Sequence, residues 1–138
     1  MNNYLVYSVF GNENFYNEVL YSILSYLKFH KEDENLIVIL TDNADFLKKR
    51  ISNNITYHEL NEEKIKLWKG KRNFVHRVKV KVIQDVVSKY EGNFLYLDSD
   101  TYFIKNCSEI FENINSNAIY FDKCETLNLR NGKNKALI

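Results

Sequence analysis

Short, continuous apolar runs alternate along this chain with longer stretches whose apolar residues recur at helical spacing. The short runs predict buried strands at residues 4–10, 36–41, 55–60, 94–98 and 118–121. The longer stretches predict a helix capped by Asn14 and further helices at residues 44–50, 62–68, 74–90 and 108–114. Strands and helices alternate with short connections, which favours a three-layer α/β domain around a mostly parallel sheet.

Two of the expected helices carry apolar stripes that should face the sheet. The stripe of the first helix comprises Phe15, Val19, Leu20, Ile23, Leu24 and Leu27. The stripe of the helix at residues 74–90 comprises Val75, Val78, Val82, Val86 and Tyr90. With these stripes, the chain has enough apolar surface for one domain that spans residues 1–138.

An apolar run that ends in two aspartates, Asp98 and Asp100, is the most informative local feature. If the strand continues through both residues, their side chains point to the same face and repel each other. A divalent cation removes this repulsion, and carboxylate ligands suit Mg²⁺, Mn²⁺ or Ca²⁺ better than zinc. Such a site leaves coordination positions for phosphate oxygens. The alternative is that Asp-Ser-Asp-Thr serves only as turn and capping chemistry.

Three polar segments fall at the carboxyl ends of expected strands: Gly11-Asn12-Glu13, the turn at Asp42, and the Asp98–Asp100 pair. In open parallel sheets, ligands bind at these ends, near the point where the strand order reverses. The three segments are therefore expected to converge on one crevice.

Charge is unevenly distributed although the net charge is only +1. Residues 64–89 contain nine Lys or Arg and one acid, Asp85, which gives +8 there and −7 for the remainder. This segment is either a solvated helix face or an anion site, for which a diphosphate beside a metal is the natural ligand. No nucleic-acid-binding motif accompanies it, so we expect no nucleic-acid partner.

The remaining composition indicates a cytoplasmic protein. Cys107 and Cys124 lack a metal-ligand spacing and are expected as free thiols, no secretory signal is visible, and the longest aliphatic run, residues 36–40, is too short to span a bilayer. Peripheral contact with the inner face of a membrane stays open.

Several segments together resemble the N-terminal, nucleotide-binding part of a GT-A glycosyltransferase. The chain looks most like the family 8-like bacterial transferases that carry a sugar-binding D-x-D motif, and the likeness covers about residues 4–121. The matching segments are Ser8-Val9-Phe10-Gly11-Asn12, Val19-Leu20-Tyr21-Ser22-Ile23, Thr41-Asp42, His76-Arg77-Val78-Lys79-Val80-Lys81, Tyr96-Leu97-Asp98-Ser99-Asp100-Thr101 and Ile110-Phe111. The resemblance implies a Rossmann-like GT-A core that is incomplete at its C-terminus.

The same resemblance implies a function and a set of site residues. Asp98 and Asp100 would hold Mn²⁺ or Mg²⁺, which binds the diphosphate of a nucleotide sugar, usually a UDP-sugar, and neutralises the departing charge. The implied donor-binding residues are Val9, Phe10, Asn12, Arg77, Lys81, Asp98 and Ser99. The resemblance does not imply whether the acceptor is a carbohydrate, a lipid-linked molecule or a protein. Polysaccharide biosynthesis at the bacterial surface is expected from the family.

The chain also departs from this family. Family members continue into a segment that binds the acceptor and often supplies a metal-ligating histidine, whereas His30, His58 and His76 all precede the D-x-D strand. No residue is assigned as a catalytic base, and Asp122 and Glu125 are weak candidates for approaching an acceptor. We therefore expect the donor-binding portion of a longer transferase.

Two other functions stay open. A haloacid dehalogenase-type phosphatase also has D-x-D after an apolar strand, but after its first strand, and with threonine or valine where this chain has Tyr102. The other alternative is a non-catalytic, transferase-like module that binds a partner.

Overall fold

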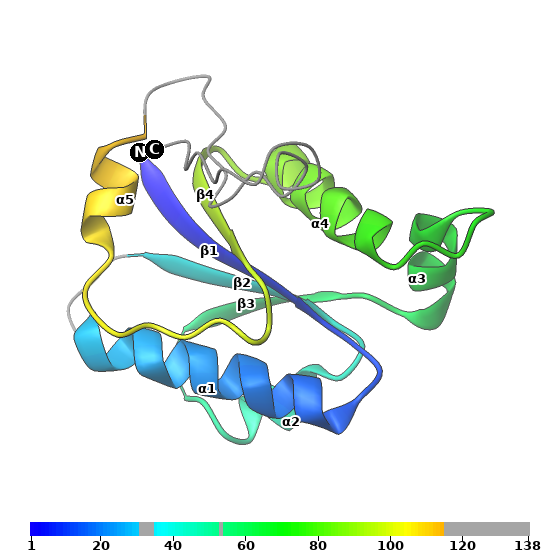
Figure 1. Ribbon diagram of the computed structural model, residues 1–138, viewed down its shortest axis with the longest axis horizontal. Coiled ribbons are helices and arrows are strands. Elements are labelled where there is room, and N and C mark those ends of the chain that lie inside the picture. Colours follow the sequence, from blue (N-terminus) through cyan, green and yellow to red (C-terminus); the bar gives the residue numbers. More distant parts are fainter. Residues whose placement is uncertain (31–34, 53, 115–138) are drawn as a thin grey trace, which may run out of the picture.

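The computed structural model describes residues 1–30, 35–52 and 54–114 of the 138-residue chain. Four strands and five helices alternate in these residues (Figure 1). In chain order they are β1 (Asn2–Val9), α1 (Glu13–Phe29), β2 (Leu36–Thr41), α2 (Ala44–Lys48), β3 (Ile55–Glu59), α3 (Glu62–Lys69), α4 (His76–Lys89), β4 (Gly92–Leu97) and α5 (Ser108–Glu112).

The four strands form one parallel sheet in the order β3-β2-β1-β4. Tyr4 of β1 is paired with Leu36 of β2 on one side and with Phe94 of β4 on the other. The chain therefore moves outward from β1 to β3 and then returns past β1 to place β4. Because crossovers between parallel strands are right-handed, this reversal carries the later helices to the opposite face of the sheet.

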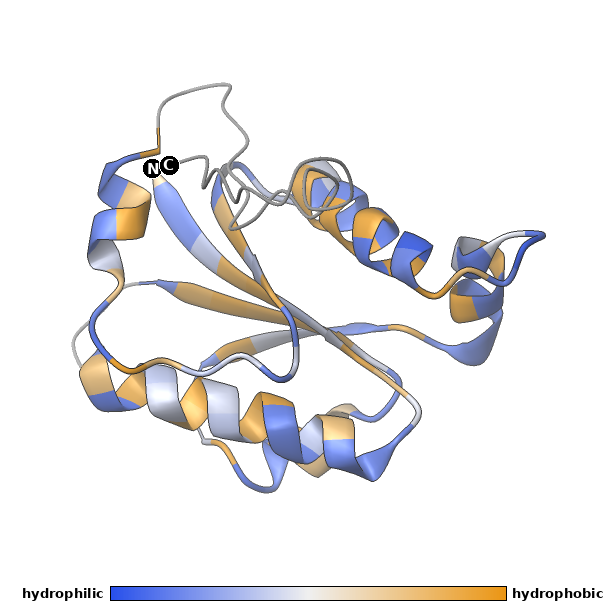
Figure 2. Ribbon diagram, viewed as in Figure 1, coloured by the Kyte–Doolittle hydropathy of each residue, from blue (hydrophilic) through white to orange (hydrophobic). Residues whose placement is uncertain are grey.

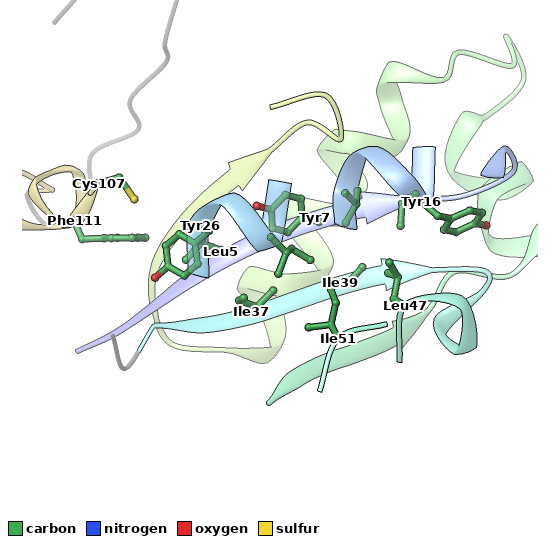
Figure 3. Packing of buried hydrophobic residues seen from close by; sticks show 13 residues of the cluster. Leu5, Tyr7, Tyr16, Tyr26, Ile37, Ile39, Leu47, Ile51, Cys107 and Phe111 are labelled. Carbon is green, nitrogen blue, oxygen red and sulfur yellow. The ribbon is translucent and has the colours of Figure 1, made fainter. Parts of the chain in front are cut away.

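One face of the sheet is covered by α1, α2 and α5. Leu5, Tyr7 and Val9 of β1 point to this side and pack with Tyr26 of α1 and Phe111 of α5 (Figure 3). Tyr7 and Ser22 are both buried and share a hydrogen bond of 2.9 Å between their hydroxyl groups. This polar contact anchors α1 over the centre of the sheet.

The other face is covered by α3 and α4. Tyr4 and Val6 of β1 point to this side and pack with Val78, Val82 and Val86 of α4. Figure 2 shows β2 hydrophobic along most of its length, as expected for a strand with helices on both faces. The prediction of a three-layer α/β domain with a parallel sheet is confirmed.

Gly92 allows the close approach of β4 to β1. It pairs with Asn2, has φ +156°, and a Cβ built on it would lie 2.3 Å from the Asn2 carbonyl oxygen. Any other residue would push the start of β4 away from β1.

Details of the predicted helices differ from the structure. The N-cap of α1 is Asn12, whose Oδ1 accepts a 2.9 Å hydrogen bond from the Asn14 N–H, so the predicted cap at Asn14 is wrong. Phe15 and Leu24 are exposed, because the buried stripe of α1 is centred on Val19 and includes tyrosines at both ends.

The remaining predictions concern single residues, the segment after residue 114 and the length of the helices. Val75 is exposed because it precedes the first residue of α4. Cys107 is buried. The expected strand at 118–121, Asp122, Cys124 and Glu125 lie outside the described residues. Within the part of the chain that is described, none of the helices meets the length and hydropathy needed to cross a bilayer.

Candidate functional site

The carboxyl ends of all four strands lie at one edge of the sheet, because the strands are parallel. The strand order reverses between β1 and β4, so the connection from β1 to α1 and the turn after β4 meet at a topological switch point. Figure 1 shows these two neighbouring strands leaving the sheet at this edge. This is the position at which open α/β sheets bind ligands.

The two aspartates lie in a turn rather than on a continuing strand. β4 ends at Leu97, and both the N–H and the Oγ1 of Thr101 donate to the Asp98 carbonyl oxygen, at 3.2 and 2.6 Å. The predicted strand end at Asp98 is therefore one residue too late. The condition under which Asp98 and Asp100 would share one strand face is not met, and both side chains are exposed.

Asp98 already has a cationic partner. The Lys79 ammonium, on α4, lies 2.7 Å from Asp98 Oδ1. Lys79 thus reaches the turn from the helix that covers one face of the sheet. Lys79 was not predicted as a site residue, whereas Arg77 and Lys81 were. The signal that could have indicated it is its place in the basic segment, next to Val78 of the apolar stripe.

The first helix holds the other side of the turn. Ser99 Oγ donates to Glu18 Oε2 at 2.9 Å, and the Phe103 N–H donates to Ser25 Oγ at 2.8 Å. Asp98 is therefore tied to α4 and Ser99 to α1, from opposite faces of the sheet. Glu18 was not predicted as a site residue, and its partner is 81 positions away in the sequence.

The loop after β1 is fixed by Asp42 at the end of β2. The Gly11 N–H donates to Asp42 Oδ2 at 3.0 Å, and the Tyr16 hydroxyl donates to Asp42 Oδ1. Burial, reinforced by the hydrogen bond to Asp42, raises the pKa of Tyr16 to about 12. Gly11 has φ +89° with open space where a Cβ would be, so the turn there depends on glycine's backbone freedom.

The predicted donor-binding residues of this loop have different environments. Val9 is buried in the core, which leaves only its backbone for a ligand. Phe10 is partly buried against the cluster under α3 and α4, and Asn12 caps α1. Phe10 and Asn12 thus flank Gly11 at the carboxyl end of β1, the strand that neighbours β4.

Arg77 and Lys81 make contacts elsewhere on α3 and α4. Arg77 Nη1 donates to the carbonyl oxygens of Trp68 at 3.2 Å and Leu67 at 3.5 Å, which satisfies the C-terminal end of α3. Lys81 Nζ donates to Gln84 Oε1 at 2.9 Å on the same helix. The structure therefore gives Arg77 a capping role, while Lys79 is the cation that contacts the aspartate turn.

A separate hollow of about 350 Å³ lies at the same edge, between the ends of β2 and β3. Its lining residues are Thr41, Asp42, Asn43, Ala44, Asp45, Lys48, Tyr57, His58 and Glu59. Within the described part of the chain, the Tyr57 hydroxyl is buried and has no hydrogen-bond partner. Burial also raises the pKa of Tyr57.

The donor set at the aspartate turn fits a partial metal site. In the described residues, no three His, Cys, Asp or Glu side chains gather in a way that would enclose a metal ion. Asp98 and Asp100 supply hard oxygen atoms, which suit Mg²⁺ or Mn²⁺ when phosphate oxygens and water complete the coordination.

No protein-family model, curated protein or solved structure matches this chain. Function is therefore inferred from the carboxyl edge of the sheet itself.

Proposed function

We propose that this chain is the donor-binding part of a metal-dependent glycosyltransferase of the GT-A type, with a nucleotide-diphospho-sugar, most simply a UDP-sugar, as donor. The observation that supports it best is the Asp98-Ser99-Asp100 turn directly after β4, beside the loop that follows β1. An exposed pair of carboxylates at a switch point suits a cation that binds phosphates.

Asp98 and Asp100 would hold Mn²⁺ or Mg²⁺, which as a Lewis acid neutralises charge on the departing diphosphate. Phe10 and Asn12 would contact the nucleoside from the loop after β1. Ser99, held by Glu18, keeps the turn in place. The Lys79 ammonium adds positive charge beside Asp98 and is suited to face a diphosphate.

The phosphatase alternative has less support from the topology. Three strands, β1, β2 and β3, precede the strand that leads into the aspartates. A haloacid dehalogenase-type motif would instead follow the first strand of the core, where this chain has the loop at Gly11.

Calorimetric titration with UDP, with and without Mn²⁺, tests the proposal. The wild-type chain should bind UDP in a manganese-dependent way, and Asp100→Ala should weaken this binding by about tenfold or more, because even residues that only support metal ligands contribute roughly 10–100-fold. Glu91→Ala is the matched control, since Glu91 is an exposed carboxylate just before β4, at the opposite edge of the sheet.

Circular dichroism should confirm that each variant is folded. A folded wild-type chain without manganese-dependent UDP binding, or an Asp100→Ala variant that binds like wild type, would overturn the proposal and favour a partner-binding module.

A further inference from the structure

The connection between α3 and α4 forms a tip that displays large apolar side chains. We define the α3–α4 tip as residues 66–77; it projects beyond the sheet in Figure 1. The exposed fractions are 73% for Leu67, 57% for Phe74 and 48% for Val75. Figure 2 shows hydrophobic and strongly hydrophilic segments side by side in α3, at the start of α4 and in their connection. Exposed apolar side chains that gather in one place indicate an interaction surface.

The tip is also strongly and uniformly basic. Its cations are Lys66, Lys69, Lys71, Arg72 and Arg77. No Asp or Glu occurs anywhere between residues 64 and 84. Among the described residues, Lys66, Lys69, Lys71 and Arg72 form no salt bridge, whereas Lys64 and Lys89 both pair with Asp85. The tip therefore presents cations whose charge is not neutralised within the described part of the chain.

The tip is held in shape by its own backbone. The Asn73 N–H donates to the Gly70 carbonyl oxygen at 3.0 Å, and the Phe74 N–H donates to the Lys69 carbonyl oxygen at 3.1 Å. Gly70 and Asn73 both have positive φ, at +68° and +49°. Arg77 bonds back to the end of α3. The turn thus presents Phe74 and its neighbours at fixed positions.

We propose that the α3–α4 tip is a peripheral docking site for an anionic lipid bilayer. Leu67, Phe74 and Val75 would enter the boundary between headgroups and acyl chains, while the lysines and Arg72 contact lipid phosphates. Charge complementarity selects an anionic surface. The exposed aliphatic side chains, Leu67 and Val75, favour a bilayer over a single-stranded nucleic acid, which binds through several separate stacking rings, because the exposed rings of the tip, Phe74 and His76, contact each other at 5.3 Å between centroids.

Docking by the tip would orient the candidate site. The tip continues into the first turn of α4, and Lys79 in that turn reaches Asp98 at the carboxyl edge. A bilayer under the tip therefore lies on the same side of the molecule as the aspartate turn, which suits a lipid-borne acceptor. This consequence for the acceptor rests on the proposed function, whereas docking itself does not.

Vesicle co-sedimentation of the full 138-residue chain tests docking without nucleotide or metal, so its outcome is independent of donor binding. The chain should bind vesicles with about 30% phosphatidylglycerol and not pure phosphatidylcholine. Binding should fall steeply when salt rises from about 0.1 M to about 1 M, because salt screens the contacts to lipid phosphates.

Two variants separate the electrostatic and apolar contributions. The triple variant Lys69→Ala/Lys71→Ala/Arg72→Ala should bind roughly 100-fold more weakly, at about fivefold for each cation. The double variant Leu67→Ser/Phe74→Ser should lose about tenfold or more while the salt dependence stays. The matched control is Ile104→Ser/Lys105→Ala, since Ile104 is 75% exposed in another loop, and this variant should bind like wild type.

Three outcomes would overturn the proposal. The first is a folded wild-type chain that does not bind anionic vesicles. The second is equal loss in the control and in the tip variants. The third is that the chain binds a labelled single-stranded RNA more tightly than anionic vesicles, as measured by fluorescence anisotropy. This result would indicate that the tip is a nucleic-acid-binding surface.

Discussion

Lys79 should compete with a metal ion for Asp98, and Lys79→Met tests this competition. The two groups are 2.7 Å apart, with side chains 38% and 49% exposed. An ion pair with this exposure to solvent contributes about 0.2–1 kcal/mol to stability. A cation that binds Asp98 must displace Lys79, and the free energy contributed by the ion pair is then lost. The corresponding change in affinity is about 1.4- to 5-fold.

Removing the ammonium should therefore have opposite effects on two ligands. Mn²⁺ alone should bind about 1.4- to 5-fold more tightly to Lys79→Met, as measured from the electron paramagnetic resonance signal of free Mn²⁺. UDP at saturating Mn²⁺ should bind more weakly by calorimetry, because one positive charge near the diphosphate is lost. The free energy of unfolding should fall by no more than about 1 kcal/mol.

Lys89→Met is the matched control on the same helix. Lys89 pairs with Asp85 at 2.6 Å and its side chain is 40% exposed, so this variant also removes one charge and one ion pair. It should leave Mn²⁺ and UDP binding unchanged. Equal Mn²⁺ affinities in wild type and Lys79→Met, or equal gains in both variants, would refute direct competition at Asp98.

Two further predictions concern the core and the pH dependence of stability. Tyr7→Phe should lower the free energy of unfolding by about 1–3 kcal/mol, because the buried Ser22 hydroxyl loses its tyrosine partner. In a double-mutant cycle measured by urea unfolding, Tyr7→Phe/Ser22→Ala should lose less unfolding free energy than the sum of the two single variants. Burial and then the charge of Lys89 lower the pKa of His58 in the folded chain. As the pH falls, His58 is therefore protonated first in the unfolded chain, and the free energy of unfolding should decrease below about pH 6.5. His58→Gln should flatten that decline, and an unchanged slope would contradict the assignment.

Most of the fold was predictable because its strands are short apolar runs with polar boundaries. Residues 36–41, for example, were predicted as a strand and form β2. The prediction failed where local polar chemistry decides the end of an element. Thr101 turns the chain by bonding to the Asp98 carbonyl oxygen, and Asn12 rather than Asn14 caps α1. Both asparagines have cap chemistry, so residue type alone does not choose between them.

The sequence predicted the location of the candidate site better than its side-chain contacts. Its location followed from strand ends that share one edge. Its contacts depend on tertiary placement: Glu18 meets Ser99 across 81 positions, and Lys79 meets Asp98 only because α4 lies over the sheet with its Val78 stripe inward. The rotation of α4 that favours Lys79 over Lys81 is set by this packing.

The central position of β1 also bears on how the protein is made. β1 leaves the ribosome first, yet one of its two partners, β4, ends 88 residues after the end of β1, at Leu97 against Val9. At ordinary elongation rates this partner arrives roughly 4–18 s later. During that interval one side of β1 has no native strand to pair with, and non-local parallel pairing is intrinsically slow. Nascent chains that end before Leu97 should therefore depend on chaperones, and the sheet should close only after β4 has emerged.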